Sequence, residues 1–188
     1  IVKQDGSMYD GMEYRFAPIP EISADETARE AVERAVSTIG AGTAATGRYP
    51  VVLKDTQMGA LLRSFFEVFS AENAQKGLSL LRGREGENIA AECLTLVDDP
   101  FYPGYPAQQP FDAEGVATRK KNVIEKGVLR TLLHNRKTAA KAKAASTGNA
   151  ARAGYAGAVT IAPYSFYIEP GTQTQEELFA KAEGGIYV

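Results

Sequence analysis

The sequence predicts an α+β fold with a mixed, mainly antiparallel sheet and a few packed helices. Strand-like segments dominate from residue 88 onward, and they do not alternate with helices in the βαβ order of a parallel sheet. Two earlier segments, residues 24–40 and 58–73, place apolar residues at the three- and four-residue spacing of an amphipathic helix. Together these observations indicate that helices and strands are segregated along the chain.

The first predicted helix spans residues 24–40. Ser23 followed by Glu26 fits a capping box, in which each side chain pairs with a free backbone amide at the start of a helix. Gly40 is expected to end the helix. The following stretch, "GAGTAATGRYP", is rich in Gly, Ala and Thr, as exposed linkers are. We therefore expect the main domain boundary near residue 47.

The second predicted helix, residues 58–73, reads "MGALLRSFFEVFSAEN" and follows "YPVVLKD", which is expected to form a short buried strand. Apolar side chains recur along one face of this helix at Met58, Leu61, Leu62, Phe65, Phe66 and Phe69. Burial of the three Phe side chains could supply roughly 5 kcal/mol or more, at about 1.5–3 kcal/mol each. The pattern predicts a core helix.

The rest of the chain is predicted to be mostly extended. "NIAAECLTLVDDP" is rich in strand-forming residues, and residues 115–135 resemble a hairpin that turns at residues 125–127. "RKTAAKAKAA" has high helix propensity. A strand interrupted at Pro163 follows, then a helix that begins at Thr174 and an extended "GGIYV".

Composition limits the function classes. The net charge of −2 argues against non-specific nucleic-acid affinity of the whole chain. No apolar run approaches the ~18–20 residues needed to span a bilayer, so no membrane association is expected. The single cysteine, Cys93, excludes an internal disulfide framework and suits a reducing cytoplasm. One histidine and one cysteine offer little for a soft-metal site.

Two groups of residues could carry chemistry. The carboxylates Asp98, Asp99, Asp112 and Glu114 could bind a hard cation or form an acid–base pair, but they also fit turn chemistry, which we favour. His134 could form a nucleophilic dyad with Cys93. Because Cys93 is expected to alternate inside an apolar strand, we favour a packing role for its thiol.

The segment 115–152 is strongly basic. A single acidic residue, Glu125, accompanies ten cationic residues: Arg119, Lys120, Lys121, Lys126, Arg130, Arg136, Lys137, Lys141, Lys143 and Arg152. A nucleic-acid patch is one interpretation, but the segment has no aromatic residue on which a base could stack. A solvated surface or a surface for an anionic partner is the interpretation we favour.

Five motifs follow one another along the chain: "GRYPVVL", "VDDP", "FDAEG", "STGNA" and "EPG". Together they resemble the TldD/PmbA family, metallopeptidase-related proteins also labelled modulators of DNA gyrase, and the resemblance runs from about residue 47 to the end. It implies part of a larger two-domain fold. Residues 1–46 would be the end of an N-terminal α/β domain and a linker, and residues 47–188 an incomplete, β-rich C-terminal-type domain.

The family's metal motif is replaced in this sequence. In the catalytic branch a helix carries HExxxH, and a later cysteine completes a zinc site. Aligned on the double leucine before that motif, Arg63, Ser64 and Val68 occupy the positions of the first His, the Glu and the second His. Cys93 does not match the ligand cysteine. The resemblance therefore implies the PmbA/TldE branch, and we expect no catalytic residue, no metal and no cofactor.

The resemblance implies a metal-free subunit of a peptide-processing assembly, which we expect in the cytoplasm. Its partner would be a TldD-type metallopeptidase subunit or a second copy of the chain, and peptide would enter the chamber between them. The candidate substrate or partner surface comprises Arg119, Lys120, Arg136, Asn149 and Arg152. Two alternatives stay open: a hydrolase with a carboxylate and histidine site, and a nucleic-acid-binding module that uses residues 115–152.

Overall fold

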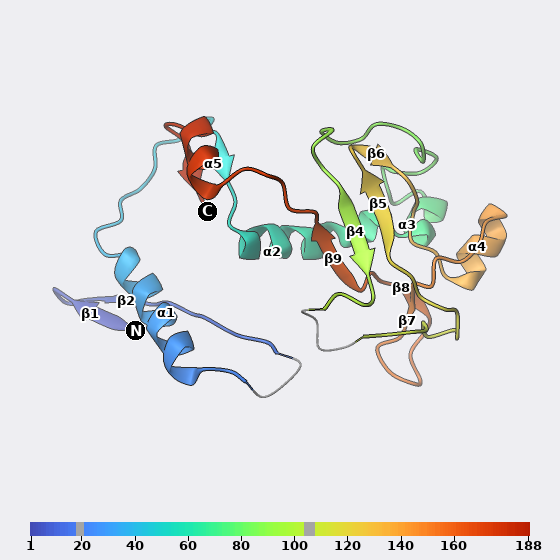
Figure 1. Cartoon of the computed structure of the whole chain (residues 1–188), viewed down its shortest axis with the longest axis horizontal. Coiled ribbons are helices and arrows are strands. Elements are labelled where there is room, and N and C mark those ends of the chain that lie inside the picture. Colours follow the sequence, from blue (N-terminus) through green and yellow to red (C-terminus); the bar gives the residue numbers. More distant parts are fainter. Residues whose placement is uncertain (18–20, 104–107) are drawn as a thin grey trace. The chain divides into compact units, whose positions relative to one another are not determined.

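A computed structural model of the chain describes residues 1–17, 21–103 and 108–188 (Figure 1). The chain divides into two compact units. The first contains Ile1–Arg48, and the second contains Tyr49–Tyr102 and Gln108–Val188.

The first unit begins with a hairpin of β1 (Val2–Gln4) and β2 (Ser7–Tyr9). Asp5 and Gly6 connect the two strands with φ angles of 48° and 80°, the left-handed conformations that a two-residue type I′ turn requires. Gly11 follows the hairpin, where a Cβ would lie 2.1 Å from the carbonyl oxygen of Ala31. Only glycine permits so close an approach between this backbone and the helix.

Helix α1 (Ala24–Ser37) completes this unit, and its predicted start is confirmed. The hydroxyl of Ser23 accepts a hydrogen bond from the backbone N–H of Glu26 at 3.2 Å, which caps the first turn. The helix ends before the predicted Gly40, because the backbone N–H of Thr38 bonds back to Ala35 and closes the last turn.

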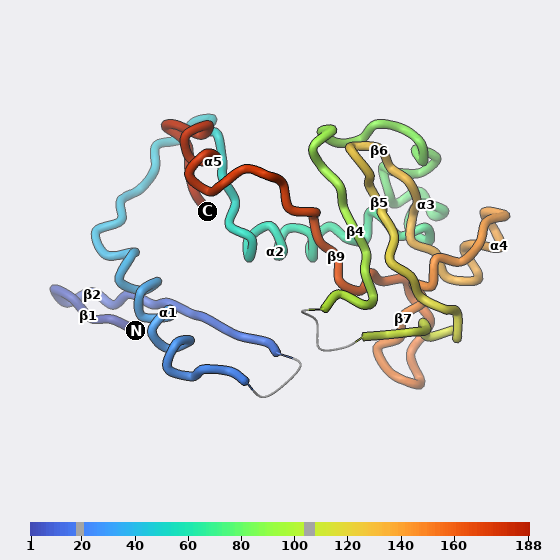
Figure 2. The backbone as a smooth tube through the Cα atoms, viewed as in Figure 1, coloured from blue at the N-terminus to red at the C-terminus, as the bar shows by residue number. Residues whose placement is uncertain are grey.

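The second unit is built on a four-stranded antiparallel sheet, which confirms the predicted α+β class (Figure 2). Its strands, in order across the sheet, are β6 (Val128–Leu129), β5 (Lys121–Glu125), β4 (Leu96–Asp99) and β9 (Ser165–Ile168). Figure 2 shows β4 between β5 and β9, two strands that lie far apart in the sequence.

The predicted hairpin is also confirmed. Ile124 of β5 pairs with Leu129 of β6, and the turn between them has positive φ angles at Lys126 and Gly127. A Cβ on Gly127 would lie 2.5 Å from the carbonyl oxygen of Ala90, so this turn requires glycine for its conformation and for the space around it.

The prediction of one continuous helix over residues 58–73 is wrong. The segment forms α2 (Asp55–Phe65), a 3₁₀ helix η1 (Phe66–Phe69) and α3 (Ala71–Lys76). Ser70 interrupts the helix with an extended backbone and forms a β-bridge with Leu133. Long-range backbone pairing therefore overrides helix propensity at this point.

The apolar stripe of this segment is only partly buried. Phe69 belongs to the core and contacts Phe166 of β9, with ring centroids 5.5 Å apart. In contrast, Leu61 is 45% exposed and Phe65 is 58% exposed. The expectation that all of α2 is a core helix is therefore wrong for this chain. The core itself consists of Phe69, Ala71, Ala74, Leu81, Leu96, Val123, Ile124, Leu129, Leu132, Leu133 and Ile161.

Two expected strands also differ in the structure. Of residues 88–100 only Leu96–Asp99 forms a strand, because the N–H groups of Ile89 and Ala90 both donate to the carbonyl of Gly127 and bend the chain. Cys93 consequently lies in an exposed turn, and its predicted packing role is wrong. The strand expected to be buried before α2 is β3 (Val51–Val52), in which Val51 is 53% exposed.

The two remaining helices follow the predictions. Helix α4 (Arg136–Ala142) and helix α5 (Gln175–Lys181) begin with complete capping boxes at Asn135 and Thr174. The strand interrupted near Pro163 gives β8 and β9. The short strands are β7 (Ala150–Ala151), β8 (Thr160–Ile161) and β10 (Ile186–Tyr187), and β10 pairs in parallel with β3. Among the described residues, every helix is too short or too polar to cross a bilayer.

Candidate functional site

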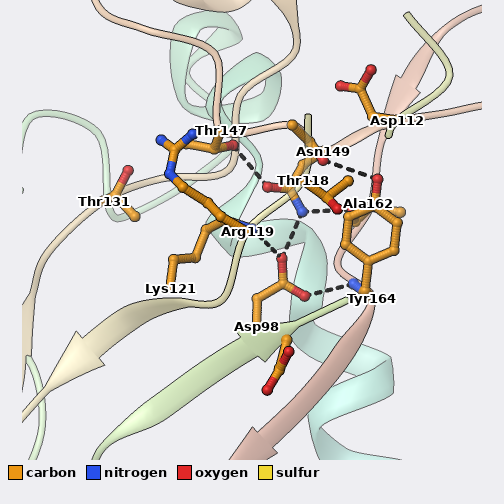
Figure 3. Close-up of polar contacts among 12 residues, drawn as sticks. Asp98, Asp112, Thr118, Arg119, Lys121, Thr131, Thr147, Asn149, Ala162 and Tyr164 are labelled. Atoms are coloured by element: carbon orange, nitrogen blue, oxygen red, sulfur yellow. Dashed lines mark hydrogen bonds and ion pairs between the residues drawn. The ribbon is translucent and has the colours of Figure 1, made fainter. Parts of the chain in front are cut away.

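A buried carboxylate, Asp98, lies at the centre of a polar cluster in the second unit (Figure 3). One carboxylate oxygen, Oδ2, accepts hydrogen bonds from Lys121 Nζ at 2.9 Å and from Asn149 Nδ2 at 2.7 Å. The other, Oδ1, accepts one from the backbone N–H of Tyr164 at 2.6 Å. We call Asp98, Lys121, Asn149 and Tyr164 the Asp98 cluster.

The register of the sheet brings Lys121 to Asp98. The two residues are direct partners on the neighbouring strands β4 and β5, where side chains on one face lie close together. Asp98 is fully buried, and the Lys121 side chain is 8% exposed. Burial lowers the pKa of Lys121 from its usual 10.5, and the Asp98 carboxylate partly counters that shift.

Asn149, from the "STGNA" motif, ties a loop to this pair. Its side-chain amide donates to Asp98 and, at 3.0 Å, to the carbonyl of Ala162. Its Oδ1 accepts a hydrogen bond from the Thr147 hydroxyl at 2.8 Å. Every polar atom of the side chain is thus used inside the protein, as a fully buried amide requires.

Tyr164 closes the cluster from the segment that leads into β9. Its hydroxyl donates to the carbonyl of Gly148 at 2.9 Å. Burial, together with the nearby carboxylates of Asp112 and Asp98, raises the pKa of Tyr164 to about 12. The phenol is therefore a hydrogen-bond donor at physiological pH and is poorly suited to proton transfer.

Of the other predicted carboxylates, Asp99 and Asp112 serve turns, as the favoured interpretation expected, whereas Glu114 accepts the backbone N–H of Arg136 at the start of α4, at 2.7 Å. Asp112 accepts backbone N–H groups from Glu114 and Val116 at 2.9 Å and from Ala150 at 3.1 Å. Asp99 accepts the N–H of Phe101 at 2.9 Å. These bonds fix the loop at residues 112–116 and the turn after β4.

His134 is buried and contacts Thr138, with 3.2 Å between Nδ1 and the threonine hydroxyl. Burial lowers the pKa of His134 below its usual 6.5. Its neighbours are structural, and Cys93, the other half of the hypothetical dyad, lies in an exposed turn. The imidazole is better suited to packing beside α4 than to activating a thiol.

The residues predicted to contact substrate or partner fall into two classes. Arg119, Lys120, Arg136 and Arg152 are exposed, whereas Asn149 is fully buried. Asn149 is therefore not part of the exposed surface, and its side chain instead makes hydrogen bonds inside the protein. The exposed cations have local contacts, such as the 5.9 Å separation of Lys120 Nζ from the centroid of the Tyr167 ring.

The positions that a metal motif would occupy carry unsuitable side chains. Arg63 presents a cation, and the Ser64 hydroxyl donates to the carbonyl of Ala60 at 3.0 Å. Val68 has no lone pair and packs against the core. Within the described parts of the chain, no three His, Cys, Asp or Glu side chains are grouped as a metal ion would require. The donor set does not fit zinc.

Sequence reasoning missed Lys121 and Tyr164. A signal for Lys121 was present, since it alternates with Val123 along β5 and Val123 is fully buried. A lysine on an inward face needs a buried counter-charge. No comparable signal marks Tyr164, because its role depends on a backbone N–H that meets Asp98 only in the folded chain.

The chain resembles known proteins over most of its length. A protein-family model described as the PmbA/TldA metallopeptidase C-terminal domain matches residues 46–188. A metalloprotease of Methanothermobacter thermautotrophicus is 31% identical over 165 residues, which are 87% of this chain and 36% of that protein. A metalloprotease PmbA homologue of Buchnera aphidicola is 28% identical, over 100% of this chain and 40% of its own.

Solved structures show the same resemblance. A candidate modulator of a DNA gyrase from Thermotoga maritima has a TM-score of 0.89 and 37% identity, and the match covers 98% of this chain and 42% of that one. TldE from Thermococcus kodakarensis has a TM-score of 0.87 and 25% identity, with 96% and 41% covered. The chain thus spans less than half the length of these relatives.

Proposed function

The chain belongs to the PmbA/TldA metallopeptidase family, and from this premise we propose that it acts as a metal-free subunit of the PmbA/TldE type. It takes part in peptide processing by helping to enclose a chamber. Its partner is a TldD-type metallopeptidase subunit, or a second copy of the chain where no such subunit exists.

One observation carries this proposal: the side chains at the metal-motif positions of α2 and η1. A metallopeptidase needs His or carboxylate donors to hold Zn²⁺ and a Glu to activate the bound water. Arg63 instead places a positive charge where a cation would bind, and Val68 offers no donor atom. The hydroxyl of Ser64 is already bonded within the helix.

The contribution of this subunit is confinement and binding of peptide. The exposed cations Arg119, Lys120, Arg136 and Arg152 supply N–H donors that suit the carboxylates of a peptide. Asn149 holds the loop that carries Arg152 through its bond to Asp98.

No specific observation favours the hydrolase or nucleic-acid alternatives. Asp98 and Asp112 accept several hydrogen bonds each from their own fold, and His134 is buried beside Thr138. In the basic segment, Lys121 pairs with Asp98 and Arg130 with Glu125, which reduces the positive charge available to a phosphate backbone.

The test is reconstitution with a TldD-type subunit from the same source, using the full-length polypeptide that carries this chain. We expect the two to co-elute in size-exclusion chromatography and peptidase activity to rise on mixing. Arg63→Ala is the matched variant, and it should leave this activity unchanged because the position holds no metal. Separate elution together with unchanged activity would contradict the proposal, and so would a loss of activity on Arg63→Ala.

A further inference from the structure

The loop at residues 152–159, which joins β7 to β8, combines a firm base with an exposed tip. Tyr155 is 97% exposed. Arg152, on the same loop, donates from Nη1 to the carbonyl oxygen of Tyr155 at 3.3 Å. Figure 1 shows this loop extending beyond the β7–β8 pair.

The base of the loop is held from both sides. On the β7 side, the buried Ala150 donates its N–H to Asp112 at 3.1 Å and accepts the N–H of Ala113 at 3.0 Å. On the β8 side, Ile161 lies in the core, and the N–H of Ala162 donates to the carbonyl of Asn149 at 3.1 Å. Asp112 and Asn149, the second a member of the Asp98 cluster, therefore fix the place from which the tip projects.

The tip has the residue types of a binding surface. Tyr and Arg are the side chains that most often anchor interfaces, and Tyr gives a large contact area with only two side-chain torsions to fix. Arg152 is the only charged residue between Ala144 and Ile168. Within the described residues its guanidinium uses one of its five N–H donors, in the bond to Tyr155.

We propose that the 152–159 loop binds an extended peptide that carries a carboxylate next to an apolar or aromatic side chain. The guanidinium of Arg152 takes the carboxylate, and the ring of Tyr155 packs on the apolar neighbour. This inference rests on the proposed role in peptide processing and names the peptide class. A single aromatic residue beside a single cation suits a peptide better than a nucleic-acid strand, which needs successive stacking platforms and cations that follow the backbone.

Fluorescence anisotropy on the full chain tests the proposal with three labelled probes. The first is an unstructured peptide with two Glu-Phe pairs in a Gly/Ser background, the second has Lys-Phe pairs in their place, and the third is a single-stranded oligothymidine. The wild type should prefer the Glu-Phe peptide. Tyr155→Ala should weaken its binding about fivefold or more, and Arg152→Ala should also remove the preference for Glu-Phe over Lys-Phe.

Two variants serve as matched controls: Leu80→Ala, an apolar residue that is 91% exposed, and Lys137→Ala, a cation whose side chain is 82% exposed. Both should bind within twofold of the wild type. Wild-type affinity in Tyr155→Ala and Arg152→Ala overturns the inference, and so does binding of oligothymidine alone or of no probe. If Tyr155→Ala and Arg152→Ala leave peptide affinity unchanged while the chain still activates a TldD-type subunit, the inference fails and the proposed function stands.

Discussion

Replacing Asp98 by alanine tests whether the Asp98 cluster holds the second unit together. The change leaves the ammonium group of Lys121 without its counter-charge in a place where the side chain is 8% exposed. It also removes the acceptor for the Asn149 amide and for the backbone N–H of Tyr164. Breaking one side of a buried ion pair typically destabilises a protein by about 3–5 kcal/mol.

We therefore expect Asp98→Ala to lower the free energy of unfolding by about 4 kcal/mol. At ~2–4 °C per kcal/mol for a protein of this size, the melting temperature should fall by roughly 8–16 °C. Urea and thermal unfolding followed by circular dichroism measure both quantities. Glu92→Ala, which changes an exposed acidic residue in a turn, is the control and should lie within about 0.5 kcal/mol of the wild type.

A double variant separates the ion pair from general damage to the fold. In Asp98→Ala/Lys121→Met no buried ammonium remains, so it should be more stable than Asp98→Ala alone by about 1 kcal/mol or more. The reasoning is refuted if the free energy of unfolding of Asp98→Ala lies within about 1 kcal/mol of the wild-type value. It is also refuted if adding Lys121→Met to Asp98→Ala does not raise the free energy of unfolding.

Two further predictions concern a titration and a turn. Burial lowers the pKa of His134 below 6.5, so at mildly acidic pH the unfolded chain binds a proton that the folded chain does not, and stability falls as pH drops from 6.5 towards the folded pKa. An NMR titration of this single histidine should give a midpoint below 6.5, and a midpoint at or above 6.5 would contradict the burial argument. Gly127→Ala should destabilise the protein by about 2 kcal/mol more than Gly83→Ala in urea unfolding. Both residues have positive φ, but only at Gly127 would an added Cβ meet a backbone oxygen, at 2.5 Å. Equal decreases in the free energy of unfolding would show that crowding at the hairpin turn has no effect.

Elements with local signals were predictable from the sequence. The hairpin turn was predicted correctly because Lys126 and Gly127 lie between two apolar arms. In the structure both residues have the positive φ angles of a tight turn. Helix α5 was located from Thr174 and Glu177, whose capping box depends only on residues three positions apart. In both cases the residues that decide the structure are neighbours in the chain.

Predictions failed where distant backbone decides the local structure. Ser70 breaks the predicted helix because it forms a bridge with Leu133. The strand predicted over residues 88–100 is shortened to β4 because the carbonyl of Gly127 accepts the N–H groups of Ile89 and Ala90. Neither contact leaves a periodic pattern in the sequence, so the exposure of Cys93 could not be foreseen either.

The candidate site was half predictable. The motifs that contain Asp98, Asp112 and Asn149 were recognised, but no local pattern indicates that the amide of "STGNA" contacts the carboxylate of "VDDP". That contact places Asn149 inside the fold and leaves Arg152 at the surface above it. The domain boundary near residue 47 stays a prediction.

The metal content of the purified full-length polypeptide tests the central claim most directly. Because Arg63, Ser64 and Val68 supply no suitable donors, elemental analysis after dialysis should find far less than one zinc or manganese ion per polypeptide. Added Zn²⁺ should not raise the melting temperature. A stoichiometric ion that survives dialysis and is lost when Ser64 is replaced by alanine would contradict the account of a metal-free subunit.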